Sequence, residues 1–361
     1  MGELAAARIF NVHLNGKAAV IGRCIPRTLL FGTGIPGDSA KVFAIFEKYI
    51  YNRRSGKAAA KEKQEQTCYK EREAFMDQKV IEHRIFDEER ALYGTEGILV
   101  RDCRFDGPAD GESALKESRD VQVEDSFFNL RYPFWHDQGL TVAGCELTAL
   151  CRAALWYSED ITITDTKLHG IKALRECARA ALRGCDIVSP EFGWSVRGVK
   201  MEDCTAEGEY FMMRSDHLDF KNVRLKGKYS FQYIEDSVFE DCHFDTKDAF
   251  WHARNITVKN SVVKGEYLAW YAENITFDHC TIIGTQPLCY CKGLRLIDCE
   301  MIDTDLAFER SEVEASLTAP IISIKNPLRG QIQVPAVGEI IMDLPEAKGR
   351  VLVRQAECPA Q

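Results

Sequence analysis

The sequence lacks any uninterrupted apolar run near the ~18–20 residues that a membrane-spanning helix needs. Its first residues also lack a basic segment followed by an apolar stretch and a small-residue cleavage site. Beyond the first part of the chain the sequence lacks a positive balance, because acidic residues outnumber basic ones. Residues 1–75 hold 13 Lys/Arg against 7 Asp/Glu, a balance of +6, which leaves −15 for residues 76–361 out of the net charge of −9. We therefore expect a cytoplasmic protein whose partners are neither membranes nor nucleic acids.

Residues 1–75 share none of the periodicity found further along the chain. They contain a Gly/Pro-rich stretch, FGTGIPGD, and a charged, helix-prone run from Gly56 to Glu73. We expect a poorly ordered extension, or an over-extended gene start with Met76 as the true beginning. A partner-binding arm is the alternative. The main domain is accordingly expected to span residues 76–361.

One octet pattern returns every 19 residues between Val199 and Met301. Its copies are VKMEDCTA, LDFKNVRL, SVFEDCHF, ITVKNSVV, ITFDHCTI and LRLIDCEM. Alternation over the first three positions predicts a strand, and the polar fifth position predicts a turn. A fixed period near 20 residues that carries one strand and one turn is typical of a solenoid. The expected fold class is all-β, a right-handed single-stranded parallel β-helix.

Earlier octets extend the series toward the amino terminus. They begin at Ile98, Val121, Leu140, Ile161 and Ala180, with start-to-start spacings of 23, 19, 21, 19 and 19 residues. This predicts about eleven coils of ~19 residues, stacked ~4.8 Å apart over about 50 Å. Residues 76–97 are expected to cap one end. Residues 302–361, which Pro327, Pro335 and Pro345 interrupt, are expected to form an irregular cap at the other.

Seven of the fourteen cysteines share the sixth octet position, namely Cys103, Cys145, Cys185, Cys204, Cys242, Cys280 and Cys299. A small, weakly polar side chain suits a tight corner inside a coil, so we expect packed free thiols instead of disulfides. The Asp, Asn and Gly residues at the fifth position suit a bend with positive φ. Cys289 and Cys291 raise the alternative of a zinc site. Because zinc normally takes four convergent ligands, no metal is expected.

The segment before each octet is expected to be a second strand, and its positions are counted back from the octet start. Position −5 holds all five tryptophans: Trp135, Trp156, Trp194, Trp251 and Trp270. An exposed tryptophan ladder would suggest sugar stacking. In a strand, however, −8, −6 and −4 share one face, and burying the charged residues at −8 and −4 would be costly. We therefore expect the tryptophans to face the core, and the apolar −6 residues to floor an outer groove.

Candidate catalytic residues lie along this groove. Glu191 is the candidate acid/base; Lys172, one coil away, and Arg214 would orient it or neutralise substrate carboxylates, and Asp248 is a further candidate. Asp248 lies three coils from Glu191, about 14 Å, which exceeds the ~5–9.5 Å between glycosidase carboxylates. Candidate substrate-binding residues edge the groove: Tyr157, Tyr210, Tyr229, Tyr233, Tyr267, Tyr271, His136, His252, Arg152 and, from an inserted loop, Lys116. A structural role, such as a surface ion pair, is the alternative for each.

Several strings, in this order, resemble a bacterial family of pectin-lyase-like right-handed parallel β-helix proteins, often labelled hydrolases. They are EERALYG, GESALKES, YPFWH, RAALWY, GEYFMM, KDAFWHARNITV, GEYLAWYAENITF, CTIIGTQPLCY and LAFERS. The resemblance covers roughly Ile81 to Leu328, and departs from the family pattern at Glu88 and around Ile171–Arg175. It implies a fold and a class, and supplies no reaction for named residues.

Two functions remain open from the sequence. The first is a hydrolase or lyase that acts on an oligosaccharide laid along the groove, with Glu191 as acid/base and tyrosines against the sugar rings. The second is a solenoid without catalysis, which binds a glycan or a protein partner or serves a structural role. Neither hypothesis calls for a cofactor.

Overall fold

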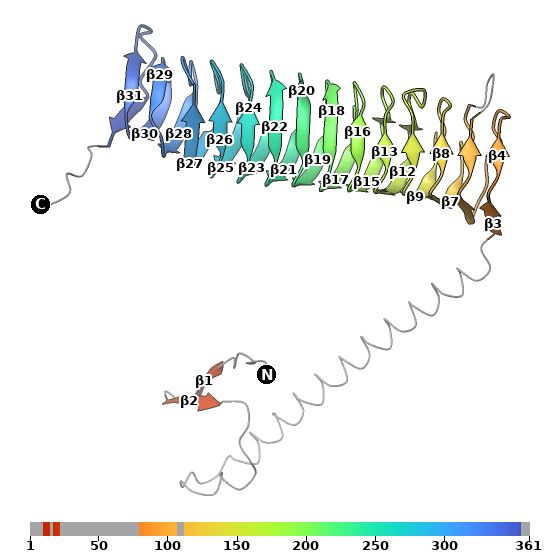
Figure 1. Ribbon diagram of the computed structural model, residues 1–361. Coiled ribbons are helices and arrows are strands. Elements are labelled where there is room, and N and C mark those ends of the chain that lie inside the picture. Colours follow the sequence, from red (N-terminus) through yellow and green to blue (C-terminus); the bar gives the residue numbers. More distant parts are fainter. Residues whose placement is uncertain (1–9, 15–16, 22–78, 107–111, 355–361) are drawn as a thin grey trace, which may run out of the picture. The chain divides into compact units, whose positions relative to one another are not determined.

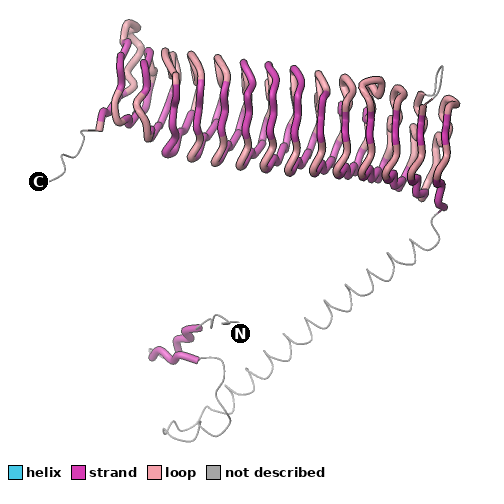
Figure 2. Tube along the Cα trace, in the orientation of Figure 1, coloured by secondary structure: helices cyan, strands magenta, loops and turns pink. Residues whose placement is uncertain are grey.

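The computed structural model describes residues 10–14, 17–21, 79–106 and 112–354, which fall in two units considered separately here. In the first unit, β1 (Phe10–Leu14) and β2 (Lys17–Ile21) pair as an antiparallel hairpin. The other expectations for residues 1–75 lie outside the described residues. Figure 2 shows strands and loops only, and these described ranges contain no helix that could cross a membrane.

The second unit is a stack of coils in which each strand pairs in parallel with the strand one coil away (Figure 1). The first sheet takes its strands from the octets. They are β3 (Lys79–Glu82), β5 (Ile98–Arg101), β7 (Arg119–Glu124), β9 (Gln138–Ala143), β12 (Glu159–Thr164), β15 (Ala178–Arg183), β17 (Arg197–Glu202), β19 (Asp216–Lys221), β21 (Glu235–Glu240), β23 (Arg254–Lys259), β25 (Glu273–Asp278), β27 (Leu294–Ile302), β28 (Glu312–Leu317), β30 (Arg329–Val334) and β32 (Arg350–Val353).

A second sheet follows the turn at the fifth octet position. It comprises β4 (Ile85–Phe86), β6 (Arg104–Phe105), β8 (Phe127–Phe128), β10 (Glu146–Leu147), β13 (Lys167–Leu168), β16 (Asp186–Val188), β18 (Thr205–Glu209), β20 (Arg224–Lys228), β22 (His243–Lys247), β24 (Val262–Lys264), β26 (Thr281–Ile283) and the end of β27. Two further pairs are β11 (Leu155–Trp156) with β14 (Leu174–Arg175), and β29 (Ile321–Lys325) with β31 (Val337–Ile341).

The fold class expected from the sequence, a right-handed single-stranded parallel β-helix, is confirmed, but the number of coils differs. The stack has about 14 turns instead of eleven. Residues 79–86, expected in a cap, form a regular coil in which Lys79 pairs with Ile98. The tail after Met301 continues the first sheet through β28, β30 and β32.

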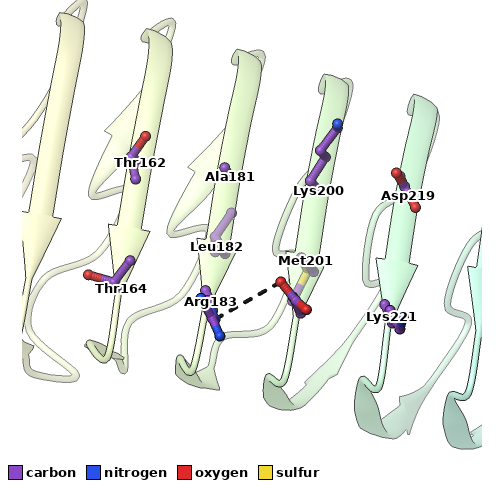
Figure 3. Close-up of a pocket in the computed structure, with 10 residues that line it drawn as sticks. Thr162, Thr164, Ala181, Leu182, Arg183, Lys200, Met201, Asp219 and Lys221 are labelled. Atoms are coloured by element: carbon purple, nitrogen blue, oxygen red, sulfur yellow. Dashed lines mark ion pairs between the residues drawn. The ribbon is translucent and has the colours of Figure 1, made fainter. Parts of the chain in front are cut away.

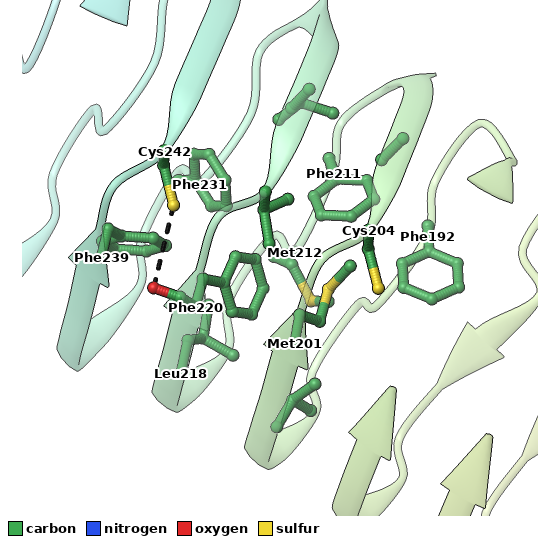
Figure 4. Packing of buried hydrophobic residues seen from close by; sticks show 14 of the residues in the cluster. Phe192, Met201, Cys204, Phe211, Met212, Leu218, Phe220, Phe231, Phe239 and Cys242 are labelled. Carbon is green, nitrogen blue, oxygen red and sulfur yellow. Dashed lines mark hydrogen bonds between the residues drawn. The ribbon is translucent and has the colours of Figure 1, made fainter. Parts of the chain in front are cut away.

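The octet explains the core directly. Its first, third, sixth and eighth positions point inward and are buried, as in Leu218, Phe220, Val223 and Leu225. The fifth-position residues adopt positive φ, as predicted, including Asp203 (φ 54°) and Asn222 (φ 51°). Figure 4 shows Phe192 and Phe211, which occupy the same position in adjacent coils, one behind the other in the interior. In-register stacking therefore fills the core with like side chains from neighbouring coils.

The cysteine column is a set of free, buried thiols, as predicted for the described cysteines. Each thiol lies near a main-chain carbonyl of the preceding coil: Cys242 Sγ lies 3.7 Å from the Phe220 oxygen (Figure 4). The serine and threonine hydroxyls of this column instead accept an N–H from the preceding coil and donate to the carbonyl two residues earlier in their own coil. The Cys242 N–H, for example, donates to Ser261 Oγ at 2.9 Å.

The expected second strand before each octet is wrong for most coils, which form turns there. Residues at −8, −6 and −4, such as Tyr210, Met212 and Arg214, have φ near 56°. These left-handed residues break the two-residue parity of a strand. As a result −7, −6 and −3 are buried, whereas most residues at −8, −5 and −4 are at least partly exposed, and we call this surface the turn face. Ala153 and Asp248 at −8, and Gln232 and Cys289 at −5, are buried exceptions.

Two expectations about side-chain direction are therefore wrong. The apolar −6 residues, including Phe231 and Phe250, are fully buried, so they form no outer groove floor. The tryptophans lie half-buried on the turn face instead of in the core. Their indole N–H groups explain their placement, because each donates to the carbonyl of the −8 residue one coil further along: Trp135 to Ala153, Trp156 to Lys172, Trp194 to Tyr210, Trp251 to Tyr267 and Trp270 to Gln286.

Candidate functional site

Two of the four candidate catalytic residues meet on the turn face. Lys172 and Glu191 occupy position −8 of adjacent coils, and Lys172 Nζ lies 3.3 Å from Glu191 Oε2. The Lys172 side chain is 30% exposed and the Glu191 side chain 24%. Solvent therefore screens the ion pair, and its contribution to stability is small. An acid/base at Glu191 would act through a carboxylate that already faces an ammonium group.

The other two candidates lie on separate coils. Asp248 stacks three coils beyond Glu191 in the −8 register, as the chain of hydrogen bonds through Tyr210 and Tyr229 shows. Burial raises the pKa of the Asp248 carboxyl, while neighbouring Lys247 opposes the shift. Arg214 is exposed at −4, with its guanidinium carbon 5.8 Å from the centre of the Tyr233 ring. These groups therefore do not gather around Glu191.

The candidate substrate-binding residues form ladders along the stack. At −4, His136 stacks on Tyr157, and Tyr233, His252, Tyr271 and Tyr290 stack with ring centres 4.8–5.0 Å apart. At −8, Tyr210 stacks on Tyr229 at 4.9 Å. Stacking covers the ring faces, so the ladders present ring edges and hydroxyls to solvent. A sugar that packs flat on an aromatic ring needs an open face, which the rings inside these ladders lack.

The tryptophan column contains a cation that was not among the candidate site residues. The Arg175 guanidinium lies between Trp156 and Trp194, 5.0 and 5.1 Å from their ring centres. Lys116, expected in a loop, occupies the same −5 register with its Nζ 5.8 Å from the Trp135 ring. Arg152 is exposed beside the turn face. At position −8, Lys247 Nζ lies 5.1 Å from the centre of the Tyr267 ring. In the tryptophan column, cations therefore lie against the ring faces of Trp135, Trp156 and Trp194.

A groove lies elsewhere, on the outer face of the first sheet, and sequence reasoning did not identify it. It spans β12, β15, β17 and β19 and has a volume of about 390 Å³. We call it the sheet groove; it is lined by Thr162, Thr164, Ala181, Leu182, Arg183, Lys200, Met201, Glu202, Asp219 and Lys221. Figure 3 shows Thr162, Ala181, Lys200 and Asp219 in one row, with Thr164, Arg183 and Lys221 in a second.

Two rows of outward octet positions make the sheet groove. The second and fourth octet positions point to solvent on β12, β15, β17 and β19. On β12 and β15 three of these four residues are small: Thr162, Thr164 and Ala181. The next two strands, β17 and β19, carry charged side chains that project further from the sheet. The surface is therefore hollowed over the small residues of β12 and β15. Arg183 faces Glu202 at 4.0 Å. The signal that could have found the groove is this change from long to small residues at outward positions.

The charges of the sheet groove are arranged in a checkerboard. Lys200 pairs in register with Asp219, and Glu202 with Lys221, so each carboxylate has an ammonium group on the adjacent coil. Strand spacing and a two-residue offset place the α-carbons of Glu202 and Asp219 about 8 Å apart. Among the described residues, no group of three or more His, Cys, Asp or Glu could hold a metal ion. The groove thus offers hydroxyls, ammonium groups and carboxylates to a polar ligand.

The fold and these surfaces define the class of the protein: a parallel β-helix with a groove on one sheet and aromatic ladders on the turn face. Within that class, residues 79–352 match the family described as "Protein of unknown function (DUF3737)", and the chain belongs to this family. A comparison with curated proteins gives no match.

Solved structures with a similar fold share little sequence with the chain. The A-module of the mannuronan C-5 epimerase AlgE6 from Azotobacter vinelandii is 9% identical, covering 78% of this chain and 92% of that one, with a TM-score of 0.33. A mutant tailspike protein of E. coli bacteriophage HK620, in complex with a hexasaccharide, is 10% identical, covering 76% and 71%, with a TM-score of 0.36.

Proposed function

We propose that this protein binds an oligosaccharide in the sheet groove. The observation that carries the proposal is the groove itself, which crosses four successive coils and is lined by hydroxyl and charged groups. A sugar hydroxyl both donates and accepts hydrogen bonds, so it can be satisfied by a carboxylate and an ammonium group at once. A surface that repeats every coil also suits a ligand built from repeating units.

The charge composition of the chain limits the chemical class of the ligand further. The acidic balance of residues 76–361 disfavours a nucleic acid, whose phosphates need clustered cations. Glu202 and Asp219 place two carboxylates on adjacent coils of the groove, and glycosidases use a pair of carboxylates. Turnover is therefore a second activity to assay once a ligand is found.

The test is a thermal-shift screen of oligosaccharides against the full-length chain. A specific ligand at about 100 times its Kd should stabilise the protein by about 2.7 kcal/mol. Ala181→Trp, which fills the floor of the sheet groove from an exposed position, should abolish that shift. Thr257→Trp, at the same octet position four coils away on β23, is the matched control and should retain it. Loss of the shift in both variants, or in neither, would remove the sheet groove as the binding site.

A second candidate keeps the original assignment to the turn face, with Glu191 as acid/base. The observation that favours it is the half-buried pairing of Lys172 with Glu191 beside the Tyr210–Tyr229 stack. The same ligand tested on Glu191→Gln and Glu202→Gln separates the two sites. Binding and turnover that survive Glu202→Gln but fail in Glu191→Gln would place the site on the turn face.

A further inference from the structure

A second groove lies on the outer face of the first sheet, where β27, β28 and β30 follow one another along the stack (Figure 1). Its volume is about 200 Å³. We call it the amide groove, because two glutamines stand among the residues that line it. Its outward side chains are Arg295, Ile297, Glu314, Ser316, Gln331 and Gln333.

An irregularity in β27 gives the amide groove its wall. The pairing of β27 with β28 shifts between Leu296 and Cys299, so Ile297 and Asp298 together face the single residue Ser316. A bulge of this kind bends its strand locally and redirects side chains. Ile297 is 39% exposed here, and the Ser316 hydroxyl donates to Asp298 Oδ1 at 2.7 Å. The groove therefore offers an apolar side chain next to polar ones.

Several polar groups of the amide groove have hydrogen-bonding capacity left for a ligand. Arg295 and Glu314 face each other in register, but they form no ion pair, and neither side chain has another partner within the described part of the chain. The Gln333 amide likewise makes no side-chain hydrogen bond there. Gln331 Oε1 accepts an N–H of Arg350 at 3.2 Å, which leaves the amide N–H groups of Gln331 available.

These groups match the chemistry of a sugar ring. A sugar hydroxyl both donates and accepts hydrogen bonds, and so does a glutamine amide, while a guanidinium donates and a carboxylate accepts. The C–H face of a pyranose is apolar and fits against Ile297. The amide groove therefore suits the same class of ligand as the sheet groove. At about half the volume, 200 against 390 Å³, it holds fewer sugar units and binds a short chain weakly by itself.

The two grooves lie on one continuous sheet. Each strand from β17 to β28 pairs in parallel with the next, through β19, β21, β23, β25 and β27. Six coil spacings of ~4.8 Å therefore separate β17, in the sheet groove, from β28, in the amide groove, a distance of about 29 Å. A polymer that runs along the stack of coils can reach both grooves, whereas a short oligosaccharide can reach one.

We propose that the amide groove is a second binding site for the oligosaccharide of the sheet groove, and that one long chain occupies both grooves at once. This inference rests on the proposed function of the sheet groove. The sugars between the grooves act as a linker, which makes the second binding event intramolecular. Affinity should therefore rise steeply at the chain length that first spans the two grooves, because a shorter chain gains nothing from the amide groove.

The test is isothermal titration calorimetry of the full-length chain with size-graded cello-, chito- and galacturonic acid oligosaccharides. In a series that binds, chains that span about 29 Å should bind at least about tenfold more tightly than short ones. Gln333→Trp, which fills the amide groove from a half-buried outward position, should lower the affinity for long chains to that for short ones. Gln122→Trp, at a half-buried outward position on β7, beyond the other side of the sheet groove, is the matched control and should keep the difference.

Circular dichroism reports whether each variant folds, and Gln333→Ala, which removes the amide without adding volume, is the milder variant if the tryptophan variant does not. Affinity that is independent of chain length would overturn this inference, and so would a length dependence that survives both Gln333 variants. In either case, short-chain binding that is lost in Ala181→Trp would leave the proposed function standing. Failure of every series to bind would overturn the proposed function, and this inference with it.

Discussion

The indole N–H of Trp194 donates a hydrogen bond to the main-chain carbonyl of Tyr210, one coil further along, at 2.7 Å. The four other tryptophans repeat this contact, and at the same −5 position Gln232 makes it with its amide, 3.2 Å from the Asp248 carbonyl. The −8 carbonyls lie outside the regular strand ladders. Half-buried carbonyls of this kind need a donor, and the −5 side chain supplies it.

This contact predicts that Trp194→Phe destabilises the protein by about 1–3 kcal/mol, because the Tyr210 carbonyl is left without its donor. The ring, and most of its packing, is retained. Met213→Phe is the matched control, since it places a phenyl ring at the same register one coil away where no donor exists. Urea unfolding measures both variants. Equal stability of Trp194→Phe and the wild type would contradict the role assigned to the indole.

The octet is the part of the structure that the sequence predicts well. Its alternation places Leu218 and Phe220 inside, and its constant spacing sets a register in which Val199 and Leu218 pair. A chain whose every coil repeats the same local choices has few alternative registers. The octet pattern does not predict the extra coils at both ends, because their sequences depart from it. Their backbones nevertheless continue the parallel pairing, as Val313 does with Gly330.

The turn face could not be predicted in the same way. Tyr210, Met212 and Arg214 adopt positive φ, which is uncommon for residues other than Gly, Asn and Asp. Nothing in these side chains signals that conformation, so strand parity gave the wrong side for Phe231 and Trp194. The backbone is held there by coil-to-coil hydrogen bonds that exist only after stacking. Local sequence therefore specifies the octet, whereas tertiary pairing specifies the turn.

Arg175 allows a prediction about the tryptophan column. Its guanidinium separates Trp156 from Trp194, with two cation–π contacts worth about 0.5–1 kcal/mol each. Arg175→Ala should therefore lower stability by about 1–2 kcal/mol. Arg175→Trp should retain most of it, since Trp135 and Trp156 already stack at 5.2 Å on adjacent coils. Urea midpoints decide the order, and an alanine variant more stable than the tryptophan variant would contradict it.

The cysteine column predicts low thiol reactivity. Burial raises the pKa of Cys145 and Cys242 to about 11, well above the ~8.5 of a free thiol. Only the thiolate reacts with iodoacetamide, so little of either residue is reactive at pH 8. Peptide mapping should show labelling of both at least 100-fold slower in the native protein than in urea. Similar rates in the two states would mean that these coils open readily.

Asp137 lies at position −3, where Ser158 and Ser215 occupy two other coils. The hydroxyls of these serines accept an N–H from the preceding coil and donate to a carbonyl there. Asp137 Oδ1 accepts the N–H of Ser118 at 2.9 Å, but Oδ2 is buried without a partner. Burial raises the pKa of the carboxyl to about 8.

The folded protein consequently holds a proton at Asp137 that the unfolded chain releases above about pH 4. This linkage stabilises the fold fully below pH 4, and the contribution is lost as pH rises through about 8. Asp137→Ser replaces the carboxyl with the hydroxyl that the column uses elsewhere. Between pH 5 and 7 the wild type should lose about 3 kcal/mol relative to this variant, since each unit is worth about 1.36 kcal/mol. Urea unfolding across that range measures the difference, and parallel stability profiles would show that Asp137 stays ionised in the fold.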